Sequence, residues 1–137
     1  MMRLIATLLI FVGALGLAVF PTSSHAGGEG PDAVFFSGIE ALPLMPGLKE
    51  IPDATLIFDS PSGRIVETYA AGVISTEAMA YFYSSSLPQL GWSTLGASSF
   101  QREGEVLEIH TIGPVAADGS RTVRFSISPV GSQTGSD

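Results

Sequence analysis

Residues 75–92 (STEAMAYFYSSSLPQLGW) are the one stretch downstream of residue 26 whose apolar residues recur at clear helical spacing. At about 100° per residue, one stripe carries Met79, Phe82, Tyr83, Ser86 and Leu90. Ser75 is suited to cap the first free amides, while Pro88 and Gly91 are typical of a sharp helix end. The stretch predicts one amphipathic helix, whose apolar face needs a partner layer.

Short apolar runs predict β-strands on both sides of this helix. The first two are expected at 54–59 and 64–73, and a third at 92–95. Leu56, Ile57 and Phe58 look too apolar for a half-exposed strand, so the first strand is expected to be buried. The order ββαβββ predicts a two-layer α+β domain, with one helix packed on an antiparallel sheet of about five strands.

The last two hairpins can be registered from the alternation of apolar residues. A two-residue turn at 103–104 places Arg102 opposite Glu105. For the final hairpin, a three-residue loop at 117–119 with a left-handed Gly119 keeps the apolar faces together. That loop predicts two cross-strand pairs, Thr111 with Phe125 and Ile109 with Ile127.

The chain divides into four predicted parts. Residues 1–26 have the layout of a signal peptide, with Arg3, an apolar stretch at 4–20 and a small-x-small site that predicts cleavage after Ala26. The alternative is an uncleaved N-terminal anchor. Residues 27–41 are interpreted as a flexible leader with a possible edge strand, 42–130 as the α+β domain, and 131–137 as a disordered tail. No membrane span is expected after cleavage.

Composition excludes several classes of function. The chain has no cysteine, which rules out thiol catalysis, disulfides and cysteine metal sites. Cleavage would leave five basic residues against 13 acidic ones, a net charge of −8, so nucleic acid is a poor partner. No phosphate loop, nucleophile elbow or metal-loop spacing occurs, and no cofactor, metal site or catalytic residue is predicted.

A proline-rich segment precedes the first confident strand. Pro43, Pro46 and Pro52 exclude a central strand and predict an extended arm that packs Leu42, Leu44, Met45 and Leu48 on the domain. A mobile arm that engages a partner through Met45 and Leu48 is the alternative. Tyr81, an aromatic on the predicted wet side of the helix, is the third candidate partner contact.

Glu108, His110 and Arg124 are expected on the solvated face of the sheet. His110 beside Glu108 could act as a general base oriented by a carboxylate, or an exposed histidine could simply lie beside a salt bridge. A small hydrolase that uses Glu67, Glu108 or Asp59 with His110 is therefore the alternative function.

The pairs Phe82-Tyr83, Leu87-Pro88 and Gly91-Trp92, followed by Phe100-x-Arg102-x-Gly104 and Leu107-x-Ile109, carry a resemblance. Over about residues 42–128, the chain resembles small exported proteins of Gram-negative bacteria without an assigned function, in which a helix ending F-Y-x-x-x-L-P-x-x-G-W leads into a β-meander. The resemblance implies the cell envelope and an α+β fold, and it transfers no catalytic residue.

These observations favour an exported domain, periplasmic or extracellular, that binds another protein or an envelope component and is not an enzyme. Binding is expected through a sheet edge, the proline-rich arm or the outer face of the helix. A purely structural envelope component differs from this only in abundance and number of partners.

Overall fold

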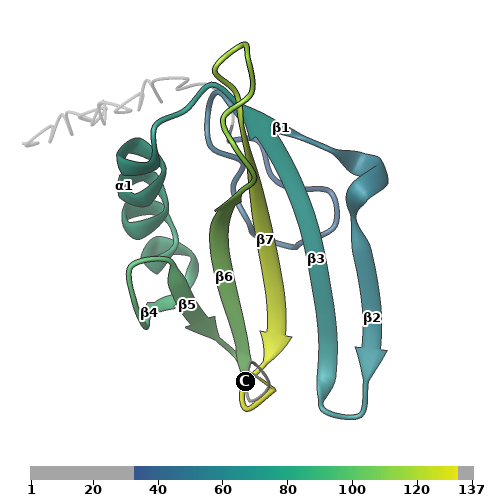
Figure 1. The fold of residues 1–137 in the computed structure, drawn as a ribbon. Coiled ribbons are helices and arrows are strands. Elements are labelled where there is room, and N and C mark those ends of the chain that lie inside the picture. The colour runs from purple at the N-terminus through teal and green to yellow at the C-terminus, as the bar shows by residue number, and fades with distance from the viewer. Residues whose placement is uncertain (1–32, 133–137) are drawn as a thin grey trace, which may run out of the picture. The chain divides into compact units, whose positions relative to one another are not determined.

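The computed structural model describes residues 33–132 of the 137-residue chain. They form one α-helix and an antiparallel sheet of seven strands in the order β1-β3-β7-β6-β5-β4, with β2 also paired to β3 (Figure 1). The strands are β1 Lys49–Glu50, β2 Leu56–Ser60, β3 Gly63–Gly72, β4 Ser93–Thr94, β5 Ser99–Arg102, β6 Glu105–Ile112 and β7 Arg121–Pro129. The helix is α1 Thr76–Ser86, and two short 3-10 turns are η1 Pro52–Ala54 and η2 Pro88–Leu90. The α+β prediction is confirmed; the sheet has seven strands rather than about five, two of them only two residues long.

Helix α1 begins as the sequence predicts. The Ser75 hydroxyl accepts a hydrogen bond from the Ala78 amide at 3.1 Å. The helix ends at Ser86, before Pro88, as predicted, although Leu87 keeps helical dihedrals (φ −63°, ψ −40°) and η2 continues the chain. Pro88 is tolerated there because it opens a new turn, where its missing N–H costs nothing. Gly91, at φ 86°, ends this turn in the left-handed conformation.

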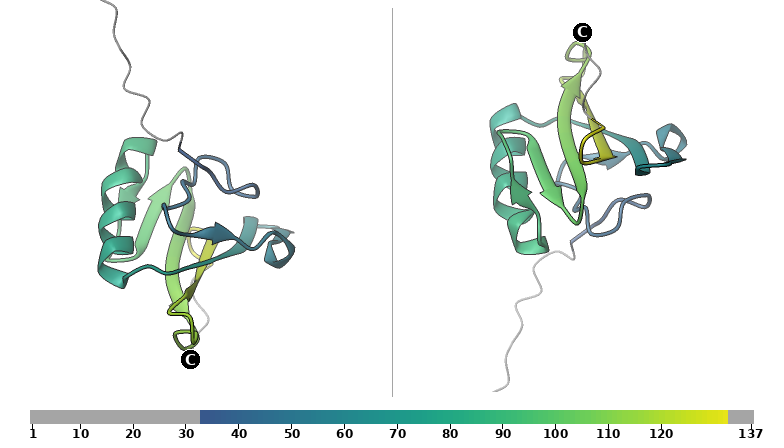
Figure 2. Two further views of the ribbon diagram at one scale, coloured as in Figure 1. Left: turned by 90° about the horizontal axis from the view of Figure 1, so that it is seen from above. Right: turned by 90° about the horizontal axis from the view of Figure 1, so that it is seen from below.

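One face of the sheet carries the hydrophobic core. In the views of Figure 2, α1 lies beside β5 and β6, and residues 33–48 lie toward β3. Phe125, at the centre of β7, joins these two covers, since its ring centroid is 4.6 Å from that of Phe36 and 5.5 Å from that of Tyr83. The sheet adds buried aliphatic residues around them: Val66, Leu107, Ile109, Val123 and Ile127.

The proline-rich segment packs on the core as an extended arm, which confirms that prediction. Leu42 and Leu48 are buried, and Leu44 and Met45 pack against the core. The preceding residues 33–41, assigned to the leader from sequence, also bury Phe36 and Ile39. The predicted signal peptide lies outside the described residues, as does the predicted tail beyond residue 132.

The small residues at the end of β3 accommodate this arm. A Cβ placed on Gly72 would lie 1.9 Å from the carbonyl oxygen of Gly47. Backbone therefore meets backbone at this point, and β1 continues from the contact along the same edge of β3, with Lys49 opposite Ala71.

The register of the last hairpin differs by two residues from the predicted one. Ile109 pairs with Phe125, and Thr111 pairs with Val123. The predicted three-residue loop does form at its tip, where the Ala116 amide donates to the Ser120 carbonyl at 2.9 Å and Gly119 is left-handed. The shift comes from two extra residues on the β6 side, around Gly113 (φ 68°) and Pro114. A shift by two keeps every side chain on its predicted face.

The Tyr83 hydroxyl ties the helix to the arm. Tyr83 is 1% exposed, and its oxygen accepts a hydrogen bond from the Met45 amide at 3.3 Å. Burial raises the pKa of Tyr83 well above its ordinary value of 10.0, against a smaller opposing effect of the Met45 hydrogen bond. The stability that depends on the protonated phenol is therefore complete below pH 10 and is lost as the pH rises toward the folded-state pKa.

Tyr83→Phe is expected to flatten this alkaline loss. Wild-type stability should fall above pH 10 by up to about 1.4 kcal/mol per pH unit through Tyr83, a slope that the variant lacks. At pH 7 the variant should cost about 1–2 kcal/mol, because the Met45 amide loses its acceptor. Urea unfolding at pH 7 and between pH 9 and 11.5 measures both effects; identical alkaline slopes would contradict this role for Tyr83.

Candidate functional site: the edge strand β2

Strand β2 exposes three consecutive large apolar residues. Leu56, Ile57 and Phe58 are 50%, 55% and 54% exposed. The prediction that this strand is buried is therefore wrong. In the part of the chain that the structure describes, β2 pairs only with β3, so its other side is a free sheet edge.

The position of β2 in the sheet explains why both of its faces are open. β3 pairs with β7 only from Val66 onward. The turn end of the β2–β3 hairpin therefore extends beyond the centre of the sheet, which β3, β7 and β6 form (Figure 1). Ile57 pairs with Val66 and shares its inward face, yet Val66 is fully buried while Ile57 is not. The core covers β3 and stops before β2.

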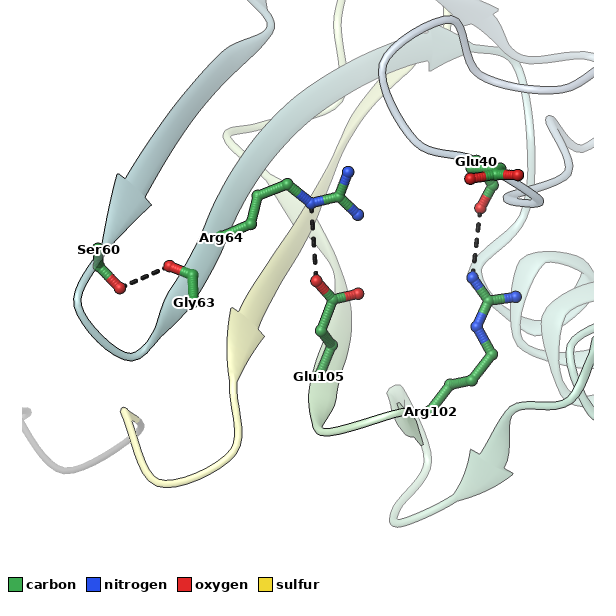
Figure 3. Close-up of polar contacts among 6 residues, drawn as sticks. All are labelled: Glu40, Ser60, Gly63, Arg64, Arg102 and Glu105. Carbon is green, nitrogen blue, oxygen red and sulfur yellow. Dashed lines mark hydrogen bonds and ion pairs between the residues drawn. The ribbon is translucent and has the colours of Figure 1, made fainter.

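Polar and close-packed contacts hold the hairpin in place (Figure 3). The Ser60 hydroxyl donates to the Gly63 carbonyl at 2.6 Å across the turn. Arg64 Nε lies 3.6 Å from Glu105 Oε1, which joins β3 to β6. A Cβ on Gly63 would come within 3.0 Å of the Pro129 ring, so the hairpin end packs against the end of β7. The hairpin is thus anchored at its turn end.

The predicted polar residues do share the outer face of the sheet. Arg124 on β7 lies directly between Tyr69 on β3 and His110 on β6, and Glu108 is in the next row. Arg124 Nε is buried without a hydrogen-bond partner within residues 33–132. The same residues contain no group of three or more His, Asp or Glu side chains placed to hold a metal ion.

Glu67, one of the carboxylates of the hydrolase hypothesis, forms a polar pair with Tyr69 on this outer face. The Tyr69 hydroxyl donates a hydrogen bond to Glu67 Oε1, and this bond, with burial and the negative charge of Glu67, raises the pKa of Tyr69. Glu67 is the cross-strand partner of Leu56, which places a carboxylate beside the exposed apolar strand.

The residues proposed for a hydrolase are not gathered in one place. Asp59 lies on β2 opposite Arg64, and β3 and β7 separate β2 from β6, which carries Glu108 and His110. A cavity of about 290 Å³ does reach His110 from the side of the helix. The other side chains that line it are uncharged and include Thr76, Met79, Ser98 and Thr111. The residues that line this cavity therefore include no carboxylate that could orient His110.

Two of the three predicted partner contacts lie together. Tyr81 is 76% exposed, and with Met45 it lines a surface hollow of about 440 Å³ along the outer side of α1. Leu48 is buried, and it lines a neighbouring hollow formed by the arm and Phe82. The structure thus brings Tyr81 and Met45 to one surface and leaves Leu48 mostly beneath it.

Comparison with known proteins adds no information about this site. No family model, curated protein or solved structure matches this chain. Within residues 33–132, none of the helices is long and apolar enough to cross a membrane.

Proposed function

We propose that this chain is a small exported binding domain, without catalytic activity of its own, that pairs with an extended segment of a partner protein along β2. Export is supported by the signal-peptide layout of residues 1–26. The observation that carries the binding function is the exposed edge strand, with Leu56, Ile57 and Phe58 each about half exposed.

A free edge of this kind favours association. The backbone groups of an unpaired edge can extend the sheet with a partner strand, and the apolar side chains on both faces add contact area. Natural proteins usually protect such edges with charges, bulges or short strands. Here η1 and the turn at 61–62 limit β2 to five residues, and its first three are all apolar.

Site-specific crosslinking in the cell tests this proposal. A photoreactive phenylalanine analogue at position 58 is expected to crosslink to one extended segment of one protein, identified by mass spectrometry of the joined peptides. The matched control is the same analogue at Val115, which is 47% exposed in the β6–β7 loop at the other end of the sheet. Equal capture of many proteins from both positions would contradict a specific site.

Ile57→Pro sharpens the test. Ile57 directs its N–H away from β3, because the residues on either side of it, Leu56 and Phe58, are the ones whose backbone groups pair with β3. Proline at position 57 therefore removes a donor of the free edge without removing a hydrogen bond between β2 and β3. We expect the crosslink from position 58 to fall at least about tenfold while the melting temperature stays within a few degrees. An undiminished crosslink in a folded variant would show that the backbone edge does not mediate the contact.

A further inference from the structure

The direction of each backbone group on β2 follows from the hairpin register. The Ile51 amide donates to the Tyr69 carbonyl at 2.8 Å, so the odd-numbered residues of β3 direct their backbone groups toward the β1–β2 edge. Leu56 lies opposite Glu67, and Phe58 lies opposite Ile65, so the backbone N–H and C=O groups of Leu56 and Phe58 are hydrogen-bonded to β3. Ile57 and Asp59 alternate with them and present their N–H and C=O groups outward.

Carboxylates bracket the apolar part of this edge. Asp59 follows Phe58 directly, and Asp53 lies three residues before Leu56, and both are exposed. Glu67 lies beside Leu56 on the outer face. Of the basic residues nearby, Arg64 is already paired with Glu105, and Lys49 lies on β1, beyond η1. The free edge is therefore an apolar strip within a negatively charged border, in a chain of net charge −7.

We propose that the segment received by β2 is a run of three apolar residues bracketed by lysine or arginine. This inference rests on the proposed function and specifies its partner. The three apolar residues cover Leu56, Ile57 and Phe58, and the flanking cations meet Asp59 at one end and Asp53 or Glu67 at the other. Charge pairing at the rim selects this partner, while backbone pairing and apolar contact hold it.

A second copy of the chain fits the same edge less well. Antiparallel self-pairing about Phe58 would place each Asp59 carboxylate beside Ile57 of the other copy, with no cation to meet it. It would also bring together two molecules that each carry a net charge of −7. The charge pattern therefore favours a different, basic segment.

Capped peptides test the inference with purified protein lacking residues 1–26. The probe is Lys-Val-Phe-Val-Thr-Lys, and its matched control is Glu-Val-Phe-Val-Thr-Glu, both followed by fluorescence anisotropy at low ionic strength. The lysine peptide is expected to bind at least about tenfold more tightly, and added salt should reduce this difference. A third peptide, N-methylated at the phenylalanine, removes the donor opposite Ile57 and is expected to lose most of the binding.

Protein variants supply the reciprocal test. The double variant Asp53→Asn, Asp59→Asn should weaken the lysine peptide several-fold and leave the glutamate peptide unchanged or slightly improved. Equal binding of the two peptides would overturn the inference, as would a dimer seen by sedimentation that Ile57→Lys abolishes. A crosslink from position 58 to a segment without flanking cations would overturn this partner chemistry while leaving the proposed function intact.

Discussion

Trp92→Ala is expected to lower the free energy of unfolding by about 3–5 kcal/mol, a large part of the total for a domain of this size. Trp92 is 2% exposed and follows the left-handed Gly91 that ends η2. The Arg102 guanidinium carbon lies 4.5 Å from the centroid of the indole ring. Arg102 also donates to the Leu90 carbonyl at 3.1 Å. Its second hydrogen bond, to the Glu40 carbonyl at 3.5 Å, is shown in Figure 3. Removing the ring thus opens a cavity. It also removes the surface on which Arg102 of β5 rests while it bridges Leu90 and Glu40.

Two further variants separate these effects. The indole N–H of Trp92 is buried without a hydrogen-bond partner within the described residues. Trp92→Phe removes that unpaired donor and keeps an aromatic face for Arg102, so it should cost clearly less than Trp92→Ala. Phe82 is only half-buried, so Phe82→Ala should cost about half as much as Trp92→Ala. Urea unfolding of the three variants measures the order; an equal loss for all three would contradict it.

Gly72→Ala is expected to cost about 3 kcal/mol, although it adds a single methyl group. The new Cβ would lie 1.9 Å from the Gly47 oxygen and 2.8 Å from its carbonyl carbon, and both are backbone atoms that no rotamer change can move. Relief requires the arm to lift away from β3, which would loosen β1 and the buried Leu48 next to it.

Gly96→Ala is the matched control for Gly72→Ala. The nearest atom to a Cβ at Gly96 is the Ser99 Cβ at 4.0 Å, so this substitution should leave the melting temperature within a degree or two. Hydrogen exchange adds a local readout, because Gly72→Ala should speed exchange of the Leu48 amide more than that of amides in β6. A Gly72→Ala variant as stable as wild type would mean that the close approach is not a structural requirement.

Local signals in the sequence were enough to predict where the helix starts, how the 102–105 hairpin pairs and which residues of the long strands face the core. Ser75 caps α1 as predicted, and Arg102 pairs with Glu105 across a two-residue turn, in which Glu103 and Gly104 both have positive φ. Each of these features depends on residues close together in the chain. The inward positions of Phe125 and Ile127 follow from alternation alone.

Features set by contacts distant in sequence were not predictable in the same way. The two-residue offset at Gly113-Pro114 leaves the alternation unchanged, so the apolar pattern cannot reveal it. The exposure of β2 depends on where the arm and α1 stop covering the sheet, and hydrophobicity alone indicated burial. Pro52 before β2 and Pro61 after it were the available signal, since prolines in a sheet are confined to edges and strand ends.

The pairing of β3 with β7 has a consequence for when the chain can fold. Tyr69 pairs with Arg124, and Phe36 of the arm packs on Phe125, so the centre of the sheet cannot form before β7 has been synthesised. Contacts of such long sequence separation slow folding, because the intervening chain must close before they form. A nascent chain without residues 121–129 lacks the strand that joins both halves of its core. The topology thus favours a chain whose sheet stays incomplete until β7 is available.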